Sequence, residues 1–225
     1  MEKIKRVGAI LLVISLIIIT GSVREKMTAK DEPIKKVLVV QKDTIKDVSG
    51  SVAMFIGDSH TANSYWGWQT LLCDKTGMKI KNLSVGGKTT TWMLGVAKKS
   101  INKDIDYCFI YGGANDMYNS QQPNIALNNI QSIVNICKLN NVEAIVITGF
   151  NPITCTNVTN VPNYSKNYYK FQQMMIDSIK DARVIDTRPV VVKSDCGDRF
   201  CHMNYSGHKK ISDTLISALM FKRIK

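Results

Sequence analysis

The residues of this chain that could do chemistry centre on one serine and one histidine. Ser59 lies in the segment 57–60, Gly-Asp-Ser-His, directly after an apolar stretch. A serine hydroxyl attacks a carbonyl group when a nearby base accepts its proton, and histidine is the usual base. Of the three histidines, His60 adjoins the serine but should point elsewhere, and His208 should lie in the last helix. His202 is therefore the candidate base for Ser59.

Two further segments could supply hydrogen-bond donors to a negatively charged oxygen. Gly86 and Gly87 follow one apolar stretch, and a glycine there lets a backbone N–H approach a ligand closely. Asn115 follows another, in Gly-Gly-Ala-Asn-Asp, and its side-chain amide could serve the same oxygen. A turn containing Asn115 and Asp116 is also explained by local capping, so the segment alone decides nothing.

Two other interpretations of these segments fail on single residues. The Gly-Lys-Thr at 87–89 suggests a phosphate-binding loop, but that motif needs a glycine five residues before Gly87, where the chain has Asn82. An α/β-hydrolase elbow, Gly-x-Ser-x-Gly, needs a glycine where the chain has Thr61. Neither motif is complete.

The elements that must position these residues alternate between short apolar strands and longer helical patterns. This alternation predicts a three-layer α/β/α sandwich around a five-stranded parallel sheet. We expect strands at 52–56, 78–83, 105–111, 142–148 and 183–185, and helices at 64–75, 91–100, 123–139, 164–180 and 206–221. Ligands of such sheets bind beyond the carboxyl ends of the strands, where the candidate residues lie, and Ser59 is expected at a helix N-terminus.

Taken together and in this order, the segments resemble the SGNH hydrolase superfamily, the GDSL-like esterases and lipases, over about residues 52–220. The matching patterns are Gly-Asp-Ser, Asn-x-Ser-x-x-Gly-x-Thr, Gly-x-Asn-Asp and His-x-Asn-x-x-Gly. The resemblance implies a flavodoxin-like fold with Ser59 as nucleophile and His202 as base. It also implies an oxyanion hole formed by the N–H groups of Ser59 and Gly87 and the amide of Asn115.

One position departs from that family pattern. The family places an aspartate three residues before the histidine, and Arg199 occupies that position here, with Asp198 one residue further away. We expect Asp198 to accept a hydrogen bond from His202 Nδ1 and fix its tautomer. A one-residue bulge held by a disulfide between Cys196 and Cys201 would allow this contact. Otherwise Asp195 or a backbone carbonyl orients His202.

The N-terminus has the sequence of an export signal. Basic residues precede an apolar run from Val7 to about Thr20, so residues 1–23 are a cleaved signal peptide or a retained membrane anchor through residues 7–23. Both alternatives place the protein outside the cell or at its surface. Residues 24–50 are expected to form a linker or stalk, and residues 51–225 the hydrolase domain.

The net charge and the positions of the cysteines indicate which binding partners, metals and cofactors to expect. The net charge of +12 favours anionic surfaces or polymers, although a solvated basic surface explains it equally well. No Lys/Arg cluster with interleaved aromatics points to nucleic acid. The six cysteines show no zinc-ligand spacing, so we expect no metal and no cofactor. Cys73, Cys108 and Cys137 lie in apolar segments and are expected to be buried thiols.

The resemblance, the leader and the small domain together predict an exported esterase that acts as a monomer on short acyl esters, O-acetyl groups of carbohydrate or cell-surface polysaccharide above all. Lysophospholipase or other lipid-esterase activity is the alternative, and a glycan O-acetyltransferase would use the same covalent step. A catalytically inactive glycan-binding module is the alternative of another class.

Overall fold

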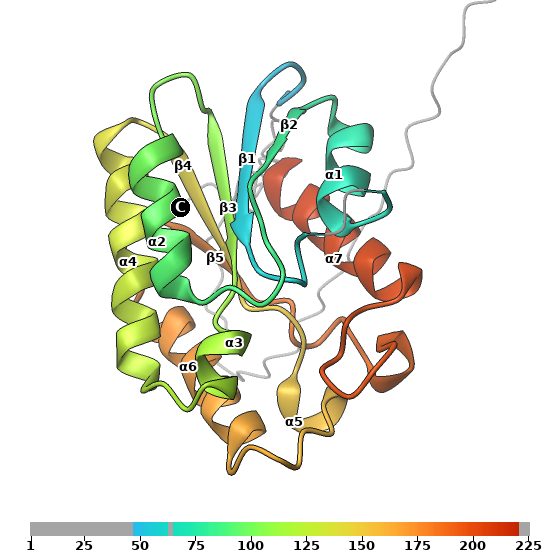
Figure 1. The fold of residues 1–225 in the computed structure, drawn as a ribbon. Helices are drawn as coiled ribbons and strands as arrows, with labels where there is room; N and C mark the ends of the chain where they lie inside the picture. The colour runs from blue at the N-terminus through green and yellow to red at the C-terminus, as the bar shows by residue number, and fades with distance from the viewer. Residues whose placement is uncertain (1–46, 63–64, 221–225) are drawn as a thin grey trace, which may run out of the picture. The chain divides into compact units, whose positions relative to one another are not determined.

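The computed structural model describes residues 47–62 and 65–220 (Figure 1). The expected signal peptide or anchor at residues 1–23 and most of the expected linker at residues 24–50 lie outside the described residues. In the described ranges, no helix is both long enough and apolar enough to cross a membrane.

The described chain is built around a five-stranded parallel sheet, as the sequence predicts. The strand order is β2–β1–β3–β4–β5, and every neighbouring pair is parallel. The strands are β1 (Val52–Gly57), β2 (Lys79–Asn82), β3 (Tyr107–Tyr111), β4 (Glu143–Ile147) and β5 (Arg183–Ile185). The central strands are buried on both faces, which explains their nearly continuous apolar sequences.

Helices cover both faces of the sheet and complete the three layers. The helices are α1 (Trp68–Thr76), α2 (Thr90–Ser100), α3 (Ala114–Tyr118), α4 (Pro123–Leu139), α5 (Pro152–Cys155), α6 (Tyr164–Ser178) and α7 (Tyr205–Met220). In addition, a 3₁₀ turn, η1, spans Lys193–Asp195. Figure 1 shows α1 and α7 on one face and α2 and α4 on the other, and α6 packs against α4.

The register of β1 and β3 explains how distant segments meet. Gly57, the last residue of β1, pairs with Tyr111, the last residue of β3. Ser59 follows Gly57 by two residues and Asn115 follows Tyr111 by four, so both leave the same edge of the sheet side by side. Parallel strands thereby bring the candidate residues to one place.

The first helix is the main departure from the expected elements. The sequence pattern predicts a helix at 64–75 and Ser59 at a helix N-terminus, but α1 begins only at Trp68, after Gly67 as its N-cap. Ser59 instead lies in a turn, in which the N–H groups of Thr61 and Ala62 donate to the Asp58 carbonyl, both at 3.0 Å. Glycine is a poor helix former, and Gly67 separates this turn from α1.

Candidate active site

The turn that carries Ser59 depends on a glycine. A Cβ atom at Gly57 would lie 2.5 Å from the carbonyl oxygen of Tyr111 and 2.7 Å from Thr61 Oγ1, so only glycine fits. The Asn82 amide donates to the Thr61 carbonyl at 3.0 Å and ties the turn to the end of β2. Ser59 is thus held in place from β1, β3 and the end of β2.

The structure brings Ser59, His202 and Asp198 into one chain of hydrogen bonds. Ser59 Oγ lies 2.8 Å from His202 Nε2, and His202 Nδ1 lies 2.6 Å from Asp198 Oδ2. These distances allow proton transfer from the serine to the imidazole. Partial burial alone would raise the pKa of Asp198, but hydrogen bonds from the ring and backbone of His202 hold it below its ordinary value. Asp198 therefore stays ionised beside the ring.

A short disulfide-closed loop sets the geometry of this pair. Cys196 and Cys201 are bonded, and around that link Gly197 N–H donates to the His202 carbonyl at 2.7 Å. Cys201 has a left-handed backbone, φ 58°, which a residue other than glycine rarely adopts. The loop therefore makes a tight bulge that returns the Asp198 carboxylate to His202 across the extra residue.

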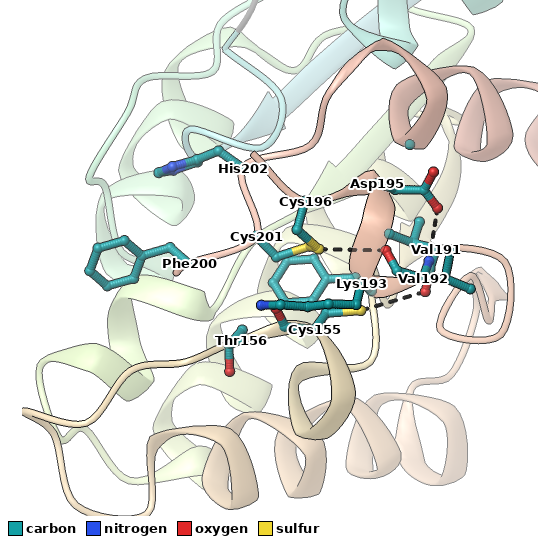
Figure 2. Close-up of a disulfide and its surroundings, with 12 residues drawn as sticks. Cys155, Thr156, Val191, Val192, Lys193, Asp195, Cys196, Phe200, Cys201 and His202 are labelled. Carbon is teal, nitrogen blue, oxygen red and sulfur yellow. Dashed lines mark hydrogen bonds between the residues drawn. A yellow bond between two sulfur atoms is a disulfide. The ribbon is translucent and has the colours of Figure 1, made fainter. Parts of the chain in front are cut away.

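The alternative carboxylate, Asp195, binds other groups and not the His202 ring. Its Oδ2 pairs with Lys210 Nζ at 2.7 Å and accepts from Val192 N–H at 2.9 Å. Figure 2 shows His202 and Phe200 projecting from one side of the loop and Asp195 on the other side of the disulfide. Asp195 anchors the base of the loop to α7 and does not orient the imidazole.

Gly87 and Asn115 line the same pocket as Ser59 and His202. Gly87 has φ 73°, the left-handed conformation that favours glycine, and a Cβ there would meet nothing within 4 Å. Asn115 Nδ2 donates to the Lys88 carbonyl at 3.1 Å and lies 3.4 Å from Asp58 Oδ2. The amide is therefore held at the pocket wall, with one of its two hydrogen bonds long.

Asp58 is a buried carboxyl group beneath the nucleophile. Its Oδ1 accepts from the His60 backbone N–H at 3.0 Å. Burial raises the pKa of Asp58 to about 7, although that hydrogen bond acts in the opposite direction. Asp58 thus supports both the turn of Ser59 and the amide of Asn115.

The other two histidines are buried and neutral, and among the described residues neither ring forms a hydrogen bond with Ser59 Oγ. The His60 ring stacks on Tyr111 at 5.6 Å, and burial, with the nearby His202 and His208, lowers the pKa of His60 to about 3. His208 lies in α7, where its Nδ1 accepts from Trp68 N–H at 3.2 Å. Burial lowers the pKa of His208 to about 4. Both serve packing.

The walls of the pocket include residues that the sequence motifs do not identify. Tyr118, Tyr164, Arg199 and Phe200 line a cavity of about 420 Å³ together with the residues above. The Tyr118 and Phe200 rings meet edge to face, with centroids 5.4 Å apart. The only signal in the sequence is the presence of Arg199 and Phe200 between two cysteines just before His202. The cavity wall therefore carries the aromatic rings of Tyr118, Tyr164 and Phe200 and the cationic side chain of Arg199.

The remaining cysteines are buried thiols in the described chain, as expected for Cys73, Cys108 and Cys137. Cys155 is also buried, and its sulfur lies within 4.8 Å of both disulfide sulfurs. A metal site there would need thiolates, which a disulfide does not offer.

Comparison with known proteins connects this geometry with a family. The model of the GDSL-like lipase/acylhydrolase family matches residues 55–210. No curated protein matches the chain.

Solved structures share the fold at low sequence identity. An acetylxylan esterase from Geobacillus stearothermophilus is 15% identical, with a TM-score of 0.63 over 80% of this chain and 99% of that one. A psychrotrophic esterase from a Pseudoalteromonas species is 20% identical, with a TM-score of 0.57 over 75% and 96%. A member of the lipolytic G-D-S-L family from Veillonella parvula is 12% identical, with a TM-score of 0.62 over 75% and 97%.

The family match covers more than half of the chain, including Ser59, Gly87, Asn115 and His202, and the solved structures agree with it in fold. The chain therefore belongs to the GDSL-like lipase/acylhydrolase family and is an ester-hydrolysing enzyme.

Proposed function

We propose that the chain is an exported serine esterase that removes short acyl groups, acetyl above all, from carbohydrate, with Ser59 as nucleophile and His202 as general base. The observation that carries this proposal is the hydrogen-bonded chain from Ser59 Oγ through His202 to Asp198, which opens onto the pocket. A serine in such a chain is activated for attack on an ester.

The reaction proceeds in two covalent steps. His202 Nε2 accepts the Ser59 proton as Oγ attacks the carbonyl carbon, and the resulting imidazolium is stabilised by Asp198. The carbonyl oxygen becomes an oxyanion, which the N–H groups of Ser59 and Gly87 and the amide of Asn115 stabilise. His202 then donates its proton to the departing alcohol, leaving an acyl-serine. Water, deprotonated by His202, attacks this acyl-serine and releases the acid.

Asn115 must redirect one N–H to serve as an oxyanion donor. Its contact with Lys88 O is the shorter of the two, at 3.1 Å, and the contact with Asp58 at 3.4 Å is near the limit of a hydrogen bond. An oxyanion offers a stronger, charge-assisted bond than this long contact. The Asn115 amide therefore gives up only the weak contact with Asp58 when it donates to the oxyanion.

The pocket and the N-terminal sequence support the rest of the proposal. Aromatic side chains such as Tyr118 and Phe200 provide flat apolar surfaces of the kind that pack against sugar rings. A cavity of about 420 Å³ suits a small acyl group with one sugar unit better than a long acyl chain with its headgroup. The basic and then apolar residues 1–23 support export, by a signal peptide or a retained anchor.

The proposal is tested by replacing the nucleophile. Ser59→Ala should abolish hydrolysis of p-nitrophenyl acetate and labelling by a fluorophosphonate, while Ser217→Ala, an exposed serine on α7, should keep both. Wild-type protein should cleave the acetyl ester faster than a palmitoyl ester and release acetate from acetylated polysaccharide.

Three results would count against it. Unchanged turnover in Ser59→Ala would remove the nucleophile assignment. Folded wild-type protein that takes up no fluorophosphonate would indicate a non-catalytic glycan-binding protein. A preference for the palmitoyl ester would indicate a lipid ester as the substrate, and not an acetylated carbohydrate.

A further inference from the structure

Arg199 places a positive charge at the pocket, three residues before His202 in the same loop. Its guanidinium lies over the Phe200 ring, with Cζ 4.8 Å from the centroid, and both side chains line the cavity. Within the described part of the chain, no carboxylate forms an ion pair with Arg199. This cation is therefore available to a ligand.

The adjacent carboxylate, Asp198, forms no ion pair with Arg199 in the described chain, and both of its oxygens lie within hydrogen-bonding distance of other groups. Asp198 Oδ1 accepts from the backbone N–H groups of Phe200 at 2.9 Å and His202 at 3.0 Å, while Oδ2 faces the His202 ring. Arg199 occupies the position three residues before His202, and the one-residue bulge leaves its side chain free of the imidazole. The same bulge that brings Asp198 to His202 thus frees Arg199 for the pocket.

The backbone holds Arg199 at the pocket. Its carbonyl accepts from Asn157 N–H at 2.8 Å, which ties the loop to the segment after α5. Phe200 packs edge to face on Tyr118, whose hydroxyl in turn accepts from the Asn160 amide at 3.0 Å. The Arg199 guanidinium therefore packs on the Phe200 ring, and hydrogen bonds and ring contacts hold the loop that carries it.

The chemistry indicates which half of the ester meets Arg199. The oxyanion must face Gly87 and Asn115, whereas the departing alcohol must take its proton from His202 Nε2. Phe200 and His202 project from the same side of the disulfide loop, as Figure 2 shows. Arg199, stacked on Phe200, accordingly lies on the side of the alcohol.

We propose that Arg199 binds an anionic group, a carboxylate or a phosphate, on the alcohol half of the substrate, so that the preferred substrates are acetyl esters of acidic sugars. The guanidinium can bind either group through two parallel hydrogen bonds. The proposal rests on the esterase function proposed above and narrows its substrate class. The overall charge of +12 would also concentrate anionic polymers near the protein.

Three matched acetyl esters test this subsite: 4-acetoxybenzoate, 4-acetoxyphenyl phosphate and the neutral 4-acetoxybenzamide. In wild-type protein at low salt, kcat/KM for at least one anionic ester should exceed that for the amide by about 5- to 10-fold, and salt should reduce this ratio. The two anionic esters distinguish carboxylate from phosphate recognition.

Arg199→Gln should abolish the preference and its salt dependence while kcat/KM for the neutral ester stays within about twofold, a change too small to reflect damage to catalysis. Arg199→Lys should keep part of the preference, because the charge remains without the planar pair of donors. Lys103→Gln removes the same charge from an exposed loop before β3, at the opposite end of the strands, and should behave as wild type.

The outcomes separate this inference from the proposed function. Equal rates on anionic and neutral esters in the wild type, or a preference that survives Arg199→Gln, would overturn the anion subsite while Ser59-dependent hydrolysis left the esterase intact. A uniform loss on all three esters in Arg199→Gln would give Arg199 a role in supporting the loop instead. If wild type cleaves none of them, the esterase proposal fails as well.

Discussion

At the scale of single residues, the central question is what orients His202. A histidine base needs its proton on Nδ1 so that Nε2 can accept from the serine, and a carboxylate at Nδ1 selects that tautomer. Two aspartates precede His202, and the sequence favours Asp198 but leaves Asp195 as an alternative. In the structure Asp198 Oδ2 lies 2.6 Å from His202 Nδ1, whereas Asp195 forms an ion pair with Lys210.

Replacing Asp198 should therefore impair chemistry and not binding. We expect Asp198→Ala to lower kcat by about 10³- to 10⁴-fold with a small change in KM, as the loss of a triad aspartate does in other serine hydrolases. The measurement is steady-state kinetics on p-nitrophenyl acetate at neutral pH.

Asp195→Asn is the matched control for this prediction. It should lower the melting temperature, because Lys210 loses its ionised partner, and leave kcat per folded molecule within a few-fold of wild type. The opposite pattern, an active Asp198→Ala and an inactive Asp195→Asn, would make Asp195 the residue that orients His202.

At the scale of elements, the loop between Cys196 and Cys201 carries both Asp198 and Arg199. The disulfide closes it over a separation of five residues, and an isolated bridge between Cys196 and Met203 pairs its two ends. This loop places Asp198 four residues before His202 and still within hydrogen-bonding distance of its ring. The disulfide is thus part of what positions Asp198 and His202.

Opening the disulfide should reduce turnover. We expect the double variant Cys196→Ser/Cys201→Ser, or reduction by dithiothreitol, to lower kcat by about 10- to 100-fold, because small misplacements of catalytic groups cost rates of this order. Loss of the loop closure should also lower the free energy of unfolding by about 2 kcal/mol. Kinetics and chemical denaturation with and without reductant measure both effects.

Cys155 provides the control, since its sulfur lies beside the disulfide but is not bonded to it. Cys155→Ala should remain sensitive to reductant, while the double variant should not respond to it. Wild-type kcat unchanged after verified reduction would show that backbone hydrogen bonds alone hold the loop.

At the scale of the whole molecule, buried histidines make stability depend on pH. In the folded state burial lowers the pKa of His208 to about 4, compared with an ordinary value of 6.5. Between these values the unfolded chain binds a proton that the folded chain does not. The contribution of neutral His208 to stability is therefore complete above pH 6.5 and is lost as the pH falls toward 4. His60 acts in the same direction, and Asp58, whose pKa is raised, acts oppositely.

Comparison with His208→Gln isolates this contribution. Between pH 7.5 and pH 4.5, the free energy of unfolding of wild type should fall by ~2 to 3 kcal/mol more than that of the variant, from the pKa shift of His208. Urea denaturation at the two pH values measures the difference. Parallel pH profiles for the two proteins would show that His208 is not buried in its neutral form in the folded protein.

The sequence alone predicted the architecture, which the structure confirms, and the candidate residues of the site. Apolar strands alternating with helical patterns predicted the parallel sheet, because each pattern follows directly from the period of its element. Four short segments led to Ser59, Gly87, Asn115 and His202, and the structure brings these residues to one pocket because parallel strands end at one edge. The start of α1 at Trp68 was missed, since the apolar pattern continues through Tyr65 and Trp66 and hides the turn.

Only the tertiary structure decided how the loop before His202 folds. The sequence favours Asp198 but leaves Asp195 open, because the choice between them depends on a left-handed Cys201, on the disulfide and on the pairing of Asp195 with Lys210. The residues of the pocket walls could likewise not be predicted from the sequence, because Tyr118, Tyr164 and Arg199 come from separate elements. Local patterns determine elements and their order, whereas the partner of a side chain depends on contacts between segments far apart in the chain.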